Sequence, residues 1–544
     1  MNKPVKFFLF CIIPVSLITG CVVSKNIHIP ANPLQNEKAK NIILIIGDGM
    51  GPQELGFLLT YARQAPNAVI KDRFTAFDRL MKNGGSLGIS MTYPGTGLIV
   101  DSASSATQLA TGQFSGSEMI GLDKNGNAVE NIIEKAKNIG KATGLVSDTR
   151  ITHATPAGFA AHQNNRDNEN EIAEDLLNLR PDVMLSGGFR HFVPIEANDQ
   201  SSSAYREIHR LTGGAFNFKS SRKDSRNLLH EAQEKGYSLA FRKSQLDQIS
   251  SAKLLGLFSE SAMPYEIDYD TTLNNPDRTV PTLKEMTSKA LDILSRNEKG
   301  FFLMVESGLI DWQLHNNDAG GTLHEMLVLN DLVEYVLEWT KNRKDTIVIV
   351  TGDHETGGIG LSYSAVDLPS GINLPGAAFK GLEFKPLFNY GRPEVLDKIY
   401  NQKISYEILF ASHFDKLPKE RQTPANLMEL FNSNSEFPIT EAGASRILAR
   451  ESNPFYVEGH KYLDKKEVPV IDDFKSFYVY QSSNRMNALA REVAEKQMTV
   501  WSTGTHTATP VLVFAGGPES SQFQGIMHHT QLAQKMIKIL LSGR

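Results

Sequence analysis

Acidic and imidazole side chains recur in short clusters along this chain, and they could hold divalent cations. Asp311 and His315 are four residues apart, so on a helical turn they share one face and can close on one cation. Asp353 and His354 are adjacent, and both can reach one metal only where a strand has already ended, which Gly352 allows. Carboxylates with imidazoles and no sulfur suit zinc or manganese, and an all-oxygen subset suits magnesium. Further candidates are Asp48, His153, Thr155, Glu306 and His506.

Each cluster has an ordinary explanation when it stands alone. A single Asp-x-x-x-His pair is usually a surface feature, and Asp48 between two glycines is typical of a turn. His506 alone is typical of a hydrogen-bonded loop histidine. A metal site is favoured only if several clusters meet at one place.

Ser102 is the candidate nucleophile. It follows Asp101 and opens a run of small residues that predicts a helix, with Ser102 as its cap or first-turn residue. The amides at a helix start favour negative charge, either an alkoxide or a phosphate, although a serine there is usually only a cap. No Gly-x-Ser-x-Gly elbow is present, so a serine near many metal ligands indicates activation by metal rather than by a hydrolase triad.

Continuous apolar runs predict the strands that must position these residues. The run 42–46 lacks the alternation of a half-exposed strand, so it is typical of a parallel strand covered on both faces. Amphipathic stretches between the runs predict an α/β fold, with a central, mostly parallel sheet flanked by helices on both faces. The other predicted strands are 143–146, 182–185, 301–305, 346–350 and 510–515, and the predicted helices include 129–137, 283–295, 323–341 and 529–541.

Polar groups follow these strands at the point where each one ends. Asp48 follows the first run, Glu306 follows 301–305, and Asp353 with His354 follows 346–350. In open α/β sheets, ligands bind outside the carboxyl ends of the strands. The agreement of several strand ends therefore predicts one shared site.

The composition is that of an ordinary globular protein. The chain has 544 residues, of which 41% are hydrophobic and 22% charged, and this excludes wholesale disorder, a collagen and a multi-span membrane protein. The formal net charge of −5 leaves no basic excess to bind nucleic acid.

The N-terminus is typical of an export signal. Lys3 and Lys6 precede an apolar run, 7–17, which is too short to span a membrane. The run ends in a sequence that resembles a bacterial lipoprotein cleavage box, in which Cys21 would carry the lipid; a plain signal peptide is the alternative. We therefore expect a protein that is periplasmic or at the cell surface and lipid-anchored to a bacterial membrane. Removal of Cys11 with the signal would leave no thiol nucleophile and no cysteine zinc cluster.

The predicted organisation has four parts. Residues 1–20 are the signal peptide, 21–40 a tether, 41–359 with 501–544 a catalytic α/β domain, and 360–500 an insertion that caps the site, builds an interface or meets the cell surface. Within the insertion, helices are expected near 424–431 and 486–497, with Thr423 as a cap before Pro424. Residues 190–280 are polar and are expected to hold helices and excursions.

Six short motifs are spread along the chain from residue 41 to its C-terminal strand and helix, outside residues 190–280 and 360–500. They are Asp48-Gly49-Met50-Gly51, Asp101-Ser102-Ala103, Thr155-Pro156-Ala157 with His162 and Arg166, Glu306 with Asp311 and His315, Asp353-His354, and His506-Thr507. Together they resemble the alkaline phosphatase family.

The resemblance implies a role for each matched residue. Ser102 would form a covalent phosphoserine, Arg166 would hold two phosphate oxygens, and Asp101 would orient Arg166. His153 and Trp312 resemble one bacterial branch and would be groups around the third metal rather than its ligands. The implied ligands are Asp311, His315 and His506 for the first zinc, which activates water; Asp48, Asp353 and His354 for the second zinc; and Glu306 and Thr155, sharing Asp48, for a magnesium ion.

The function that this resemblance implies is hydrolysis of small phosphate monoesters by a possible homodimer. A related phosphodiesterase, sulfatase or mutase is the alternative within the superfamily. Sulfatase is disfavoured because the segment after Ser102 lacks the Pro and Arg of the formylglycine motif. A surface binding lipoprotein that has lost catalysis is the alternative of a different class.

Overall fold

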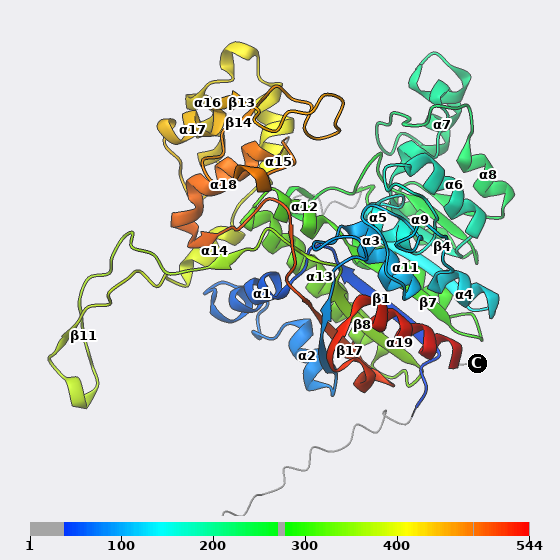
Figure 1. The fold of residues 1–544 in the computed structure, drawn as a ribbon, viewed down its shortest axis with the longest axis horizontal. Coiled ribbons are helices and arrows are strands. Elements are labelled where there is room, and N and C mark those ends of the chain that lie inside the picture. The colour runs from blue at the N-terminus through cyan, green and yellow to red at the C-terminus, as the bar shows by residue number, and fades with distance from the viewer. Residues whose placement is uncertain (1–36, 270–277, 482, 543–544) are drawn as a thin grey trace, which may run out of the picture. The chain divides into compact units, whose positions relative to one another are not determined.

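A ten-stranded sheet forms the centre of the fold (Figure 1). The structure is a computed structural model, and it describes residues 37–269, 278–481 and 483–542. The strands lie in the order β18-β2-β17-β8-β1-β7-β3-β4-β6-β5. Their bounds are β1 (Asn41–Gly47), β2 (Ser86–Met91), β3 (Ala142–Arg150), β4 (Val183–Gly187), β5 (Ser238–Ala240), β6 (Leu254–Leu257), β7 (Phe301–Ser307), β8 (Thr346–Gly352), β17 (Val511–Gly516) and β18 (Gly525–His528).

The central strand β1 shows why the runs are continuously apolar. It pairs in parallel with β7 and β8, and all of its residues are buried. Ile43 and Ile45 belong to one hydrophobic core, whereas Ile42, Leu44 and Ile46 belong to the core on the opposite face. Alternate side chains of one strand therefore need apolar helices on both sides. The predicted fold class is confirmed.

Helices from distant parts of the chain cover the two faces. The first core includes residues of α1 (Pro52–Gln64), α2 (Ala76–Lys82), α11 (Leu283–Leu294) and α13 (Ala319–Thr340). The second includes residues of α3 (Ser102–Thr111), α4 (Ile132–Asn138), α5 (Ala154–Gly158), α6 (Glu169–Leu179), α8 (Leu228–Glu234) and α19 (His529–Ser542). Local sequence sets the ends of these helices. Thr282, for example, accepts a hydrogen bond from the Glu285 amide, and Glu285 bonds back to the Thr282 amide.

Two features of the sheet add to the sequence-based expectations. The region 190–280 was expected to hold helices and excursions, and it also contributes β6 and β5, two parallel strands at the sheet edge. They are short, and β5 has only three residues, so neither gives a long apolar run. The predicted strand at 510–515 is β17, which pairs antiparallel with both β8 and β2.

The 360–500 segment begins and ends at one short strand pair. Leu361 of β10 (Gly360–Leu361) pairs with Thr499 of β15 (Thr499–Val500). The predicted helices are present as α16 (Pro424–Asn432) and α18 (Asn484–Gln497), and the Thr423 side chain caps α16. The segment also holds α14 (Glu394–Tyr400), α15 (Tyr406–Ile408), α17 (Glu441–Leu448), β11 (Ile372–Asn373), β12 (Glu383–Phe384), β13 (Arg450–Ser452) and β14 (Glu467–Pro469). Residues of α14, α16, α17 and α18 belong to the first core, so the segment packs as part of the fold.

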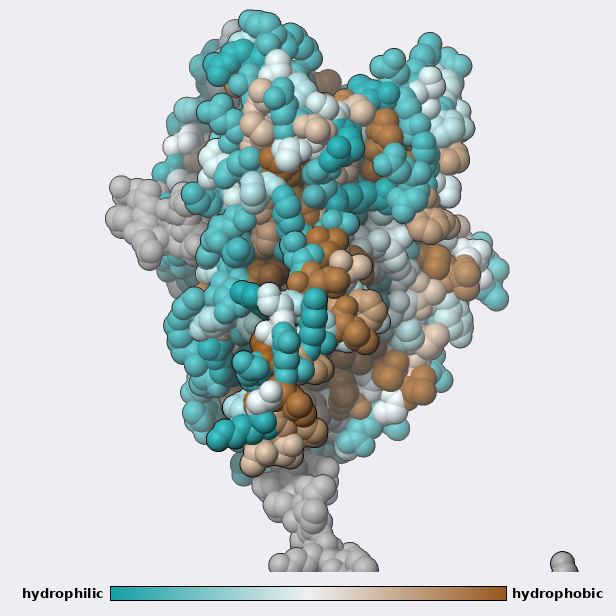
Figure 2. All heavy atoms as spheres, turned by 90° about the vertical axis from the view of Figure 1, so that its left-hand side faces the viewer, coloured by the Kyte–Doolittle hydropathy of each residue, from teal (hydrophilic) through white to brown (hydrophobic). Residues whose placement is uncertain are grey.

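A hairpin around β11 and β12 projects from this segment (Figure 1). Figure 2 looks at the molecule from the side on which the hairpin projects, and hydrophobic side chains gather on that face. The exposed large apolar side chains of residues 361–390 are Leu361, Tyr363, Val366, Leu368, Ile372, Phe379, Leu382, Phe384, Leu387, Phe388 and Tyr390.

Cys21 and the predicted signal peptide lie outside the described residues, as does nearly all of the predicted tether. Among the helices that the structure describes, none combines the length and the apolar character needed to cross a bilayer.

β8 ends at Gly352, where its backbone lies against that of Met50. A substitution at Gly352 tests this close approach. A Cβ at this position would lie 2.2 Å from the carbonyl oxygen of Met50, and backbone cannot yield as a flexible side chain can. We expect Gly352→Ala to lower the free energy of unfolding by about 1–3 kcal/mol, measured by urea denaturation. Gly56→Ala is the matched control because a Cβ there meets open space inside α1, and it should be neutral or stabilising. Equal stability of the two variants would contradict this account.

Candidate active site

The carboxyl ends of three neighbouring strands deliver acidic side chains to one edge of the sheet, the carboxyl edge. Gly47 at the end of β1 pairs with Ser307 of β7 and with Gly352 of β8. Asp48 and Asp353 therefore leave the sheet side by side, and the Gly49 amide donates a hydrogen bond to Asp353 at 3.0 Å. The turn after Gly352 also brings His354 to the same edge.

Asp311, His315 and His506 form the first of three groups whose potential ligand atoms lie within 4.8 Å of one another. Asp311 and His315 lie one turn apart on α12 (Leu309–His315), with 3.2 Å between Oδ2 and Nε2. The Nε2 atoms of His315 and His506 are 3.2 Å apart. The Nδ1 atom of His315 hydrogen-bonds to the Gly504 carbonyl, and that of His506 to the Val100 carbonyl. These bonds orient both rings so that Nε2 points into the group.

The second group consists of Asp48, Asp353 and His354, and all three are buried. The His354 Nε2 atom lies 3.4 Å from Asp48 Oδ1 and 3.2 Å from Asp353 Oδ2. The Ser102 hydroxyl is 3.2 Å from the same Nε2 atom. The candidate nucleophile therefore adjoins this group.

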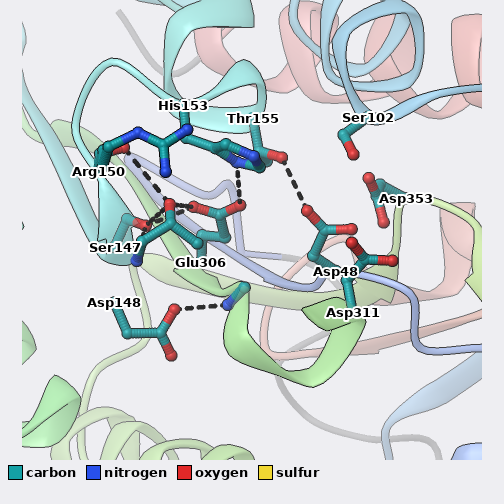
Figure 3. Close-up of polar contacts among 12 residues, drawn as sticks. Asp48, Ser102, Ser147, Asp148, Arg150, His153, Thr155, Glu306, Asp311 and Asp353 are labelled. Atoms are coloured by element: carbon teal, nitrogen blue, oxygen red, sulfur yellow. Dashed lines mark hydrogen bonds and ion pairs between the residues drawn. The ribbon is translucent and has the colours of Figure 1, made fainter. Parts of the chain in front are cut away.

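The third group consists of Asp48, His153 and Glu306 (Figure 3). The Thr155 hydroxyl donates to Asp48 Oδ2 at 3.3 Å, so Thr155 borders this group. His153 points its Nδ1 atom at Glu306, 3.9 Å from Oε1. His153 thus offers a potential ligand atom to this group.

Ser102 is the first residue of α3, and Asp101 is its cap. The Asp101 carboxylate accepts hydrogen bonds from the Ala103 and Ser104 amides at the helix start. It also pairs with Arg166, at 3.3 Å between Oδ2 and Nη1, while Nη2 of Arg166 lies 3.2 Å from His153 Nε2. One carboxylate therefore holds both the helix that begins at Ser102 and the Arg166 guanidinium.

Burial governs the electrostatics of the carboxyl edge. It raises the pKa of Asp48 well above its ordinary value, and the charges of Asp353, Asp311 and Glu306 raise it further. Burial also raises the pKa of Asp353. For Asp311, burial acts in the same direction, but the neighbouring His315 charge and hydrogen bond outweigh it and lower the pKa. The buried acids of this edge therefore disfavour one another's ionised forms, a conflict that bound cations would relieve.

Several buried atoms at this edge have no hydrogen-bond partner in the described structure. They are Asp48 Oδ1, His153 Nδ1, Glu306 Oε1 and Asp353 Oδ2. Such atoms are costly to bury unless something pairs with them. All four belong to the second and third groups, so the donor set fits bound divalent cations there.

A cavity of about 300 Å³ opens beside these groups. Ser102, Arg166, Asp311, His315 and His506 are among its lining residues. Trp312 lines it too, and its ring lies 5.9 Å from that of His153 in an edge-to-face arrangement. The structure thus brings together every site residue that the sequence indicated within the described part of the chain. His162 of the motif set instead contacts Glu134 and the Gly121 carbonyl.

Sequence reasoning missed the side chains that hold the acidic ligands. Ser147 and Thr149 both donate to Glu306 Oε2, and Thr356 donates to Asp311 Oδ1 at 2.6 Å. Their positions just beyond predicted strands could have indicated them. Tyr462 and Tyr480 line the cavity from the 360–500 segment, and no sequence pattern pointed to them.

Comparisons with known proteins agree with this geometry. The Alkaline phosphatase family model matches residues 39–542. Alkaline phosphatase 3 of Bacillus subtilis is 30% identical over 527 residues, which are 96% of this chain and 94% of that protein. Thermus thermophilus alkaline phosphatase superposes with a TM-score of 0.72 at 25% identity over 96% of each chain. The cold-active enzyme of a Shewanella species gives 0.65 at 28% identity, covering 92% of this chain and 99% of that one. The chain therefore belongs to the alkaline phosphatase family.

Proposed function

We propose that this protein hydrolyses phosphate monoesters through a covalent phosphoserine at Ser102, with two zinc ions and one magnesium ion as cofactors. The observation that carries the proposal is the position of the Ser102 hydroxyl, 3.2 Å from His354 Nε2 at the start of α3. At this position the hydroxyl adjoins the second cation group, and Arg166 lines the same cavity.

The donor types support the assignment of the metals. Two imidazoles and a carboxylate in the first group, and two carboxylates and an imidazole in the second, suit zinc. In the third group, Asp48, Glu306 and the Thr155 hydroxyl offer the oxygen atoms that magnesium prefers. The nearby imidazole of His153 makes this group less selective for magnesium than an all-oxygen set. Bound cations would lower the pKa of the nucleophiles and neutralise charge on the entering and leaving oxygens.

The protein's own side chains would then supply attack and positioning. The Ser102 Oγ atom attacks phosphorus, an Oγ–P bond forms, and the bond from phosphorus to the alcohol oxygen breaks. Water later cleaves the Oγ–P bond and releases phosphate. Amides at the start of α3 favour the negative charge, and the planar fork of Arg166 holds two phosphate oxygens.

The unpartnered ligand atoms favour an enzyme over a binding protein that has lost catalysis. Four buried donors directed into two cation groups fit retained metal sites. A panel of a phosphomonoester, a phosphodiester and a sulfate ester, run beside elemental analysis of zinc and magnesium, tests the proposal. Activity on the monoester alone is expected; preference for the diester or the sulfate would overturn it.

We also propose that the protein is exported and lipid-anchored through Cys21, and that a homodimer is its assembled form. The sequence from Lys3 to Cys21 supports the anchor. Metabolic labelling with palmitate should mark the protein and not its Cys21→Ser variant. Sedimentation of the protein without residues 1–21 would give the subunit number.

Ser102→Ala should abolish trapping of the phosphoenzyme, because Ser102 is the only proposed nucleophile. Acid quenching after incubation with labelled phosphomonoester measures the trapped phosphate. Ser117→Ala is the matched control, since Ser117 is exposed, and it should trap as much label as the wild type. Label that persists on Ser102→Ala would refute the assignment.

Arg166→Ala should raise KM and the inhibition constant of inorganic phosphate about 10-fold to 100-fold, as loss of a charged hydrogen-bond donor of about 1.5–3 kcal/mol would do. Zinc content should stay the same because Arg166 belongs to none of the cation groups. Arg63→Ala, which removes a half-exposed surface ion pair, is the control. Loss of zinc from Arg166→Ala would count against a phosphate-binding role.

Activity should rise from neutral toward alkaline pH. Burial lowers the pKa of His506 to about 4 and that of His354 well below its usual value, so both are neutral at neutral pH. Burial lowers the pKa of His315 as well, but Asp311 outweighs it and raises the net value, so a metal must displace that proton. Zinc affinity should therefore weaken as the pH falls. A pH-rate profile and a chelator competition measure the two trends, and an acid maximum would contradict them.

A further inference from the structure

We propose that Tyr462 and Tyr480, both in the 360–500 segment, form the leaving-group wall of the cavity and favour phosphomonoesters of neutral, flat ring groups, such as phenols and nucleosides. The inference rests on the proposed phosphomonoesterase function and deepens it. Neither tyrosine belongs to a cation group or has a role in the reaction described above.

The Tyr480 ring lies against the first cation group, and the Tyr462 ring lies against Tyr480. The Tyr480 ring meets the His315 ring edge-to-face, with 4.6 Å between centroids and 77° between planes. Tyr462 meets Tyr480 in the same manner, at 5.0 Å and 86°. Tyr462 is 38% exposed, which puts it at the mouth of the cavity, whereas Tyr480 is deeper. An alcohol leaving the phosphorus near Ser102 and Arg166 therefore shares this cavity with two ring surfaces.

Polar contacts hold the chain before Tyr462 and after Tyr480 against the carboxyl edge. Lys461, next to Tyr462, forms an ion pair with Asp167 at 2.6 Å, and Asp167 follows Arg166 in sequence. Asn487 of α18 donates to the His315 carbonyl at 2.8 Å and to the Asn317 side chain at 2.9 Å. The two tyrosines are thus held in place before substrate binds. Binding of a ring against them therefore costs little of their conformational entropy.

The charges around the rings select the kind of leaving group. Lys461 Nζ already lies over the Tyr462 ring, 5.0 Å from its centroid, and the Arg150 guanidinium lies over Trp312 at 5.7 Å. These cations repel an ammonium group brought to the same rings. Glu118 and Glu407 line the same cavity and oppose a second negative charge on the leaving group. A neutral ring can pack against the tyrosines without repulsion from these cations or from these carboxylates.

The test compares zinc-loaded wild type with Tyr462→Leu and Tyr462→Phe on phenyl phosphate, glycerol 2-phosphate and phosphocholine. Tyr462→Leu should lose about tenfold more kcat/KM on phenyl phosphate than on glycerol 2-phosphate, and Tyr462→Phe should restore most of the difference. Tyr456→Leu is the matched control because Tyr456 is equally exposed, at 38%, and does not line the cavity.

A binding measurement separates this inference from the proposed function, because it needs no turnover. Calorimetry should show that phenylphosphonate binds the wild type more tightly than methylphosphonate, and that Tyr462→Leu removes the difference. If the wild type hydrolyses no monoester yet keeps this binding difference, the proposed function fails and the ring wall stands. The inference would be overturned if Tyr462→Leu lost activity equally on all substrates or lost none on phenyl phosphate. It would also be overturned if the wild type preferred phosphocholine and Tyr462→Leu removed that preference.

Discussion

Negative charge held out of water at the carboxyl edge of the sheet is the constraint on which the rest of this structure depends. Asp48, Glu306, Asp311 and Asp353 are all buried there, with the imidazoles of His153, His315, His354 and His506 in the same groups. Isolated carboxylates would be strongly disfavoured in such a place. Their burial becomes reasonable when divalent cations share the edge, and the three groups of converging ligand atoms provide for them.

A layer of hydrogen bonds keeps this charge in place. The Glu355 carboxylate, next to His354, accepts hydrogen bonds from the Gly358 amide at 2.6 Å and from the Thr507 hydroxyl. The second bond links β9 (Glu355–Thr356) to its paired strand β16 (His506–Thr507), which carries His506. Buried Glu54 accepts from the Gly51 amide at 2.8 Å, and thereby fixes the loop after β1. The ligands are thus oriented by their neighbours, as they must be for several cations to bind without rearrangement.

The sequence predicted the centre of the fold better than its margins. The runs at β1, β7 and β8 are long, nearly all apolar and buried, so both the strands and the acids at their ends could be located. β5 has three residues and little pattern, so its place at the sheet edge depends on tertiary pairing with β6. Tyr462 and Tyr480 reach the cavity only through the path of the 360–500 segment, which no local signal encodes.

The pairing of Leu361 with Thr499 has a consequence for how such a protein can evolve. The chain leaves and re-enters the body of the sheet at adjacent points, and the exposed hairpin of β11 and β12 lies outside the core, so changes of length in that hairpin leave the register of the ten strands unchanged. Natural variation can therefore alter the apolar surface of this hairpin while the acidic groups at the carboxyl edge are kept.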